Sequence, residues 1–167
     1  MHRIVRRGQS RYDRVYQETE AAAVRSLLVG LLLISTTWTA MAAETIDGSD
    51  ARVGTKLLRQ ATEVLGNALS DPASIQFKAL SQPQDGMVCG LYNAKNKFGG
   101  YVGFAPFGYT AGDPQAVMLT PDFMSSKDVS KVQPQWKYAQ YLEMAGCLPE
   151  GTADALSDHI QDLALAD

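Results

Sequence analysis

The fold expected for this sequence of 167 residues follows mainly from one stretch, Met87-Val-Cys-Gly-Leu-Tyr-Asn-Ala-Lys-Asn-Lys-Phe-Gly-Gly-Tyr-Val-Gly-Phe104. Its two ends are rich in apolar and aromatic residues, which are typical of strands, whereas its middle combines Asn, Lys and Gly, which are typical of turns. We therefore expect strands over 87–93 and 100–107, with a hairpin loop between them. Four aromatic side chains are expected to cover the sheet: Phe98, Tyr101, Phe104 and Phe107.

Two further strands are expected on either side of this hairpin. Residues 73–80 alternate apolar and polar side chains, with Ile75, Phe77 and Ala79 on the apolar side, which is the pattern of a half-buried strand. A short apolar strand is expected over 116–120, after a turn that contains Gly and Pro. The connections are too short for the crossovers that parallel strands need, so an antiparallel meander is predicted.

A helix is expected before the strands. Apolar residues recur at helical spacing over 51–69, and the residue before Pro72 avoids the helical conformation and so ends the helix. Ser49 or Asp50 is expected to cap the first amides of this helix.

Helical segments are also expected after the strands. Pro134 stands at a favourable first position and Gly146 at a favourable left-handed end position of one helix, and 152–164 is expected to form a last one. An N-terminal helix, an antiparallel β-meander of three to four strands and a C-terminal helix together make an α+β domain.

The first 43 residues have the layout of a secretory signal peptide. Arginines precede the apolar run 26–34, and Ala40-Met41-Ala42 fits the small-residue rule for cleavage after Ala42. An uncleaved anchor is the alternative, although the run is shorter than the roughly 20 residues of a spanning helix. The basic segment is long for a signal, which suggests that translation starts near Val24. Residues 44–167 are then a single exported domain.

The charge of the exported part disfavours nucleic acid as a partner. Six arginines and three acidic residues fall within 1–43, so the remaining 124 residues carry nine basic and 15 acidic side chains, a net charge of −6. Nucleic-acid binding is not expected, because it depends on clustered cations that neutralise phosphates. Attraction to a basic partner is compatible with this charge, and so is a simple role in solubility.

The two cysteines, Cys89 and Cys147, are expected to pair, because export places them in an oxidising compartment. The alternative is two buried free thiols. In either state a thiol nucleophile is not expected.

The pattern Val88-Cys-Gly-x-x-Asn-x-Lys-Asn-x-Phe-Gly-Gly-Tyr-x-Gly-Phe104 resembles the signature of a group of small exported bacterial proteins, mostly uncharacterised. These proteins are similar also in a segment like Asp71-Pro-Ala-Ser-x-x-Phe77 and in a second Cys near the C-terminus. The resemblance covers roughly 57–148 and implies export without implying an activity. Leu91-Tyr92 departs from the more polar pair of that group.

The Asn/Lys stretch is the candidate binding site, because binding residues are commonly displayed on loops of a rigid sheet. A pair of cations beside amides could hold a carboxylate or a glycan. The alternative is that these residues only satisfy turn geometry and packing. The candidate binding residues are Asn93, Lys95, Asn96, Lys97 and Tyr101.

No catalytic residue, metal ligand or cofactor is assigned from the sequence. His159 is the one histidine beyond the signal, and it stands in a charged, solvated segment. Asp154, Asp158 and Asp162 recur every four residues, but calcium needs six or more oxygen ligands. Three aromatic residues could line an interface or pack a helix on the sheet: Trp136, Tyr138 and Tyr141.

These observations favour a periplasmic or secreted binding module that is not an enzyme. A specific version is an inhibitor or immunity-like protein that blocks a basic, envelope-acting enzyme. Its partner would be an envelope protein or a cell-wall component, with no nucleic acid and no membrane contact after signal cleavage. The alternatives are a cell-wall hydrolase that uses carboxylates and a secreted effector.

Overall fold

The computed structural model describes residues 43–166, so the expected signal peptide and start site lie outside the described residues, apart from Ala43. One five-stranded sheet has the order β1-β2-β3-β4-β5. Its strands are β1 (Glu44–Thr45), β2 (Gln76–Ser81), β3 (Met87–Asn93), β4 (Ala105–Thr110) and β5 (Val117–Met118). The helices are α2 (Thr55–Gly66), α3 (Val129–Val132), α4 (Gln135–Met144) and α5 (Thr152–Ala166), and the 3-10 turns are η1 (Ser49–Arg52) and η2 (Pro72–Ser74). None of the helices in this part of the chain is long and apolar enough to cross a bilayer.

The expected α+β class is confirmed, with a helix before the sheet, an antiparallel meander from β2 to β5 and helices at the C-terminal end. The parallel pairing of β1 with β2 departs from the purely antiparallel prediction. It places the start of the described chain along the edge of the sheet.

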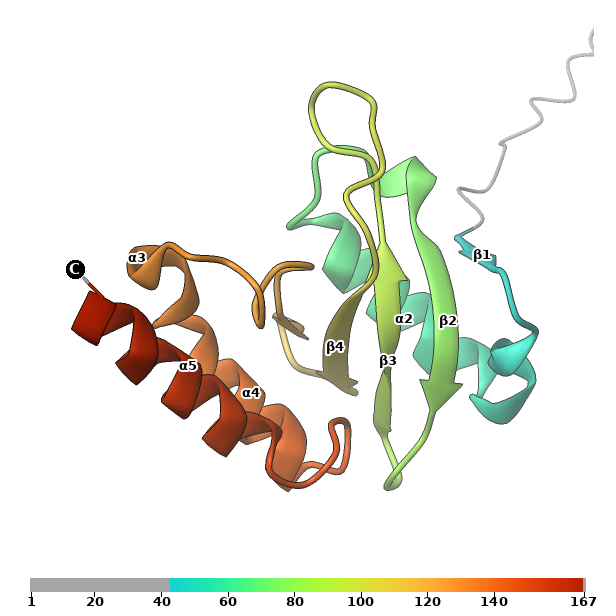
Figure 1. Ribbon diagram of the computed structural model, residues 1–167. Helices are drawn as coiled ribbons and strands as arrows, with labels where there is room; N and C mark the ends of the chain where they lie inside the picture. The colour runs from blue at the N-terminus through green and yellow to red at the C-terminus, as the bar shows by residue number, and fades with distance from the viewer. Residues whose placement is uncertain (1–42, 167) are drawn as a thin grey trace, which may run out of the picture. The chain divides into compact units, whose positions relative to one another are not determined.

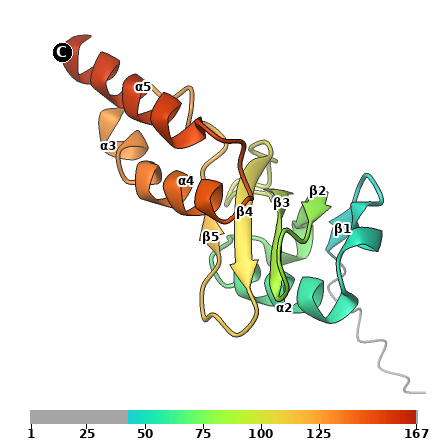
Figure 2. The same cartoon turned by 90° about the horizontal axis from the view of Figure 1, so that it is seen from below.

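The helix α2 covers one face of the sheet, whereas α4 and α5 pack together beside β4 and β5 (Figures 1 and 2), where Leu142 of α4 lies against Gly108 of β4. The larger core fills the space between α2 and the sheet around Leu65, Phe77 and Phe107, which are fully buried. A second core joins Leu119 near β5 to Leu142 of α4 and Leu156 of α5. Burial of one face of β2 and of most residues of β3 and β4 fixes the register of these strands.

The first helix is shorter than predicted. Val53 and Gly54 have extended backbones, so the helix begins at Thr55 rather than at 51, and it ends at Gly66 rather than at 69. The capping prediction is also wrong, because the Ser49 hydroxyl accepts a hydrogen bond of 2.8 Å from the Leu80 amide instead of capping the helix.

A bulge in β2 corrects the predicted alternation of that strand. Ala79 has a φ of 52°, so it faces solvent and Leu80 takes the buried position. The amide of Ala79 donates to the Asp47 carboxylate at 2.7 Å, whose other oxygen accepts from the Ser49 amide at 3.0 Å. Hydrogen bonding from Ser49 and from the Ala79 amide lowers the pKa of Asp47 from 3.8 to about 2. The side chains of Asp47 and Ser49, which follow β1, thus replace the hydrogen bonds between strands that the bulge interrupts.

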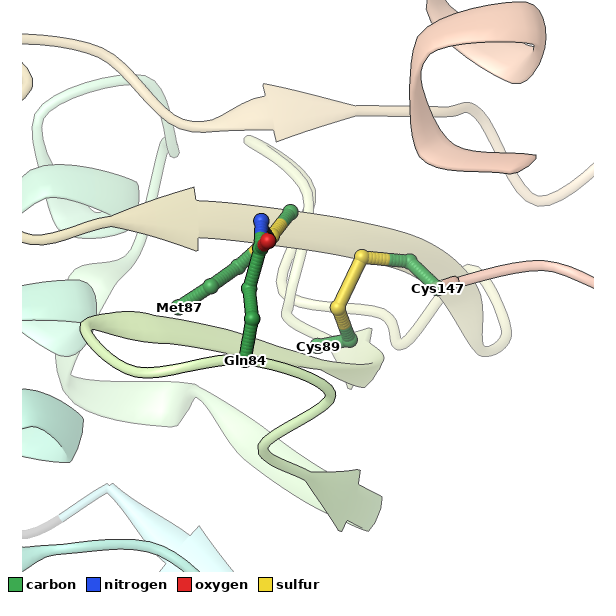
Figure 3. The surroundings of a disulfide bond; sticks show 4 residues. All are labelled: Gln84, Met87, Cys89 and Cys147. Atoms are coloured by element: carbon green, nitrogen blue, oxygen red, sulfur yellow. Dashed lines mark hydrogen bonds between the residues drawn. A yellow bond between two sulfur atoms is a disulfide. The ribbon is translucent and has the colours of Figure 1, made fainter. Parts of the chain in front are cut away.

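The expected disulfide joins Cys89 in β3 to Cys147, with a Cα–Cα distance of 5.3 Å (Figure 3). Gly146 has a φ of 78°, and the amides of Gly146 and Cys147 donate to the carbonyls of Glu143 and Leu142, which is a Schellman end to α4. This end turns Cys147 toward the sheet. Gly108 lies opposite Cys89, and a Cβ added to it would meet Leu142 Cδ2 at 2.6 Å.

Candidate binding loop

The connection between β3 and β4 rises beyond the end of the sheet (Figure 1) and contains most of the predicted site residues. We refer to residues 94–104 as the β3–β4 loop. The predicted strand over 100–107 begins only at Ala105, because Gly103 has a φ of 107° and donates its amide to Asn93 Oδ1 instead of to the ladder. A single bridge between Lys95 and Tyr101 closes the base of the loop.

Asn96 organises the turn at the tip of this loop. Its Oδ1 atom accepts hydrogen bonds from the amides of Phe98 at 2.9 Å and Gly100 at 3.2 Å. Its backbone amide donates to the Gly100 carbonyl at 2.9 Å, and its carbonyl accepts from the Gly99 amide at 2.9 Å. The base is tied to the body of the protein, since the Lys95 amide donates to Ser74 Oγ at 2.8 Å. Hydrogen bonds within the turn and one to Ser74 therefore order the loop.

The outer surface of the loop combines aromatic rings with cations. Phe98 at the tip is 84% exposed, Tyr101 is 46% exposed and Val102 is 51% exposed. The ammonium of Lys97 lies 5.2 Å from the Phe98 ring centre, and that of Lys95 lies 5.5 Å from the Tyr101 ring centre. These distances are within the range of cation–π contacts.

The structure divides the five predicted site residues into two groups. Asn93 is buried and Asn96 is committed to the turn, so the acceptor oxygens of both amides are used internally. Lys97 and Tyr101 are exposed on the outer surface of the loop, and the half-buried Lys95 reaches that surface beside the Tyr101 ring.

The most exposed large hydrophobic side chain of the loop, Phe98, is not among the five predicted site residues. The prediction that Phe98 covers the sheet is wrong, whereas Phe107 is buried in the main core as expected. The sequence feature that indicates an exposed Phe98 is its position between Asn96 and Gly99, because a residue at the centre of a tight turn cannot reach back to the sheet.

Three carboxyl groups with displaced pKa values bond to nearby amides or hydroxyls. Glu143 accepts from the amides of Gly151 at 2.8 Å and Ala153 at 2.7 Å, and these bonds lower its pKa. The pKa of Asp128 is lowered chiefly by its bond from Ser130. With Asp47, each shifted carboxyl is thus explained by a structural bond within the described chain.

The other side chains considered from the sequence occupy ordinary positions. His159 Nε2 lies 2.9 Å from the Ser126 carbonyl oxygen, a contact that ties α5 to the loop before α3. Within residues 43–166, no group of three His, Cys, Asp or Glu side chains is arranged to hold a metal ion. Trp136 packs against the second core, whereas Tyr138 and Tyr141 are 48% and 43% exposed.

The chain matches no protein-family model, no curated protein and no solved structure. The resemblance to small exported bacterial proteins therefore stays a prediction.

Proposed function

We propose that this protein is an exported binding protein that docks a partner through its β3–β4 loop, as an inhibitor of an envelope-acting enzyme. The observation that carries this proposal is the 84% exposure of Phe98 at the tip of an internally bonded turn. A large apolar side chain held in water at a rigid tip gains roughly 1.5–3 kcal/mol when a partner buries it.

The rigidity of the loop favours tight binding. Four hydrogen bonds within residues 96–100 order the turn before any partner arrives. A preformed loop loses less conformational entropy on docking than a flexible one does. Aromatic residues are also the anchors on which interfaces most often depend.

The chemistry of the loop indicates the kind of surface it fits. Phe98 requires an apolar or aromatic pocket, and Lys97 beside it and Lys95 beside Tyr101 require acidic groups at the rim. The cleft of a glycan hydrolase combines these features, since it holds a pair of carboxyl groups. The net charge of −6 over residues 44–167 would in addition steer the protein toward an enzyme of basic overall charge.

Export is supported by the sequence of the first 43 residues and by the disulfide between Cys89 and Cys147. Disulfides persist in oxidising compartments outside the cytoplasm. We therefore assign the protein to the periplasm or the medium as part of this proposal.

The alternative of a carboxylate-using hydrolase lacks a supporting observation. Such an enzyme needs one carboxyl group with a raised pKa to donate a proton. The carboxyl groups with displaced pKa values in residues 43–166 are Asp47, Asp128 and Glu143, and all three are lowered.

The test is inhibition of cell-wall digestion by a panel of basic peptidoglycan hydrolases. Wild-type protein should slow at least one of them, and Phe98→Ala should weaken the inhibition by about 30-fold, which corresponds to about 2 kcal/mol. Tyr138→Ala is the matched control, because Tyr138 is a half-exposed aromatic residue on α4, and it should inhibit like wild type. Equal inhibition by both variants would refute the assignment of the loop. Digestion of the cell wall by the protein itself would favour the hydrolase instead.

A further inference from the structure

A hollow of about 630 Å³ lies beside α2, and no residue of the β3–β4 loop lines it. Its surface is mainly apolar, and it carries two charged side chains, Arg59 and Glu63. The residues that line it are Ala43, Thr55, Leu58, Arg59, Thr62, Glu63, Gly66, Asn67 and Pro72.

The described chain begins at this hollow. Ala43 is partly buried and packs against the main core, and the amide of Glu44 donates to the Ile75 carbonyl at 3.0 Å. Ile75 follows the turn that begins at Pro72, and Pro72 lies against Gly66 at the end of α2. Ala43 is therefore held beside the C-terminal end of that helix.

The electrostatics at this end of α2 suit a cation. The C-terminal end of a helix carries a partial negative charge, and α2 has no basic residue in its last turn to balance it. Glu63 adds a full negative charge within that turn. Arg59 lies one turn earlier, and within residues 43–166 neither Arg59 nor Glu63 forms a salt bridge. An Arg placed four residues before a Glu is the weaker order for a helical pair.

We propose that the hollow is the binding site for a primary ammonium group, namely the free α-amino group that cleavage after Ala42 creates on Ala43, with Glu63 as its counter-ion. This inference rests on the export that the proposed function includes. Binding of the amino group strengthens the pairing of β1 in the processed chain relative to the precursor, because the first hydrogen bond of β1, from the Glu44 amide, directly follows Ala43. Removal of the leader and completion of the sheet edge are thereby coupled.

The charges around the site determine its pH dependence. Glu63 and the helix end favour the ammonium form, whereas Arg59 and the apolar part of the lining oppose it, and Glu44 and Asp71 lie next to lining residues. An unperturbed α-amino group has a pKa of about 7.7–8.0, and the site raises this value in the folded state. The stabilisation is then fully present below about pH 7.7 and is lost as the pH rises through the raised pKa.

The experiment uses the full chain exported with its own leader, and mass spectrometry identifies the terminus of the product. The α-amino group is labelled by reductive ¹³C-methylation and titrated by NMR in the wild type, in Glu63→Gln and in Asp50→Asn. Asp50→Asn is the control, because Asp50 is an exposed acidic residue that does not line the hollow. We expect the wild type and the control to show a pKa raised by about half a unit or more, and Glu63→Gln to return to about 7.7–8.0.

Three results would overturn the inference: a terminus other than Ala43, equal pKa values in the wild type and Glu63→Gln, or the same loss of the raised pKa in Asp50→Asn as in Glu63→Gln. A second readout is urea unfolding at pH 6.5 and 9.0, where the wild type should lose more stability with pH than Glu63→Gln does. Inhibition of a partner through the β3–β4 loop should be the same in Glu63→Gln and the wild type. Failure of the amino-group site with retained inhibition would overturn this inference and leave the proposed function standing.

Discussion

Removal of the disulfide by the double substitution Cys89→Ala and Cys147→Ala should destabilise the protein by about 4 kcal/mol. The bond closes a loop across a sequence separation of 58 residues. The chain-entropy relation gives about 4 kcal/mol at 25 °C for a loop of this length. Typical domains are stable by only about 5–15 kcal/mol, so this bond supplies a large share of the stability.

Urea unfolding followed by tryptophan fluorescence measures this loss. Reductant should lower the midpoint of the wild type to that of the double variant, and it should leave the double variant unchanged. A loss below about 1 kcal/mol would contradict this estimate, because it would mean that closing a loop of this length hardly restricts the unfolded chain. Two reactive thiols in the native, unreduced protein would contradict the pairing itself.

Two further substitutions test the packing and the edge of the sheet. Gly108→Ala should lower the free energy of unfolding in urea by about 1–3 kcal/mol, because the added Cβ would lie 2.6 Å from Leu142 Cδ2. The control Gly54→Ala, with open space around the added Cβ, should change stability by less than about 0.5 kcal/mol. Equal effects of the two variants would contradict the close contact at Gly108. The folded state lowers the pKa of Asp47 from 3.8 to about 2, so Asp47 contributes stability above pH 3.8 and loses that contribution as the pH falls toward 2. Asp47→Asn should therefore lose less stability than the wild type between about pH 4 and pH 2. An unchanged acid limb in this variant would show that the carboxylate does not support the β2 bulge.

The parts of the fold that could be predicted depend on local patterns. The strand Met87–Asn93 has the predicted bounds, because its apolar residues are followed and preceded directly by turn residues. The disulfide could be predicted because the sequence has two cysteines behind a signal for export, and Gly146, which ends α4, turns Cys147 toward the sheet.

The parts that could not be predicted depend on contacts between distant residues. β1 has only two residues and no apolar periodicity, and its partner strand lies about thirty residues further along the chain. The bulge at Ala79 is supported by Asp47 and Ser49, so the sequence of β2 alone does not contain it.

The position of the candidate loop could be predicted, but its residues only in part. Lys95, Lys97 and Tyr101 lie on the outer surface of the loop, whereas the amide of Asn93 is buried and serves the loop itself. Asn is common both in binding sites and in turns, so its residue type alone does not separate the two roles.

Photo-crosslinking in intact cells shows whether the protein docks a partner through the β3–β4 loop. A benzophenone amino acid replaces Phe98 in one variant and the exposed Lys56 of α2 in the other. Docking through this loop should give one discrete protein adduct from position 98 and none of the same mass from position 56. No adduct from position 98, or the same adduct from both positions, would contradict it.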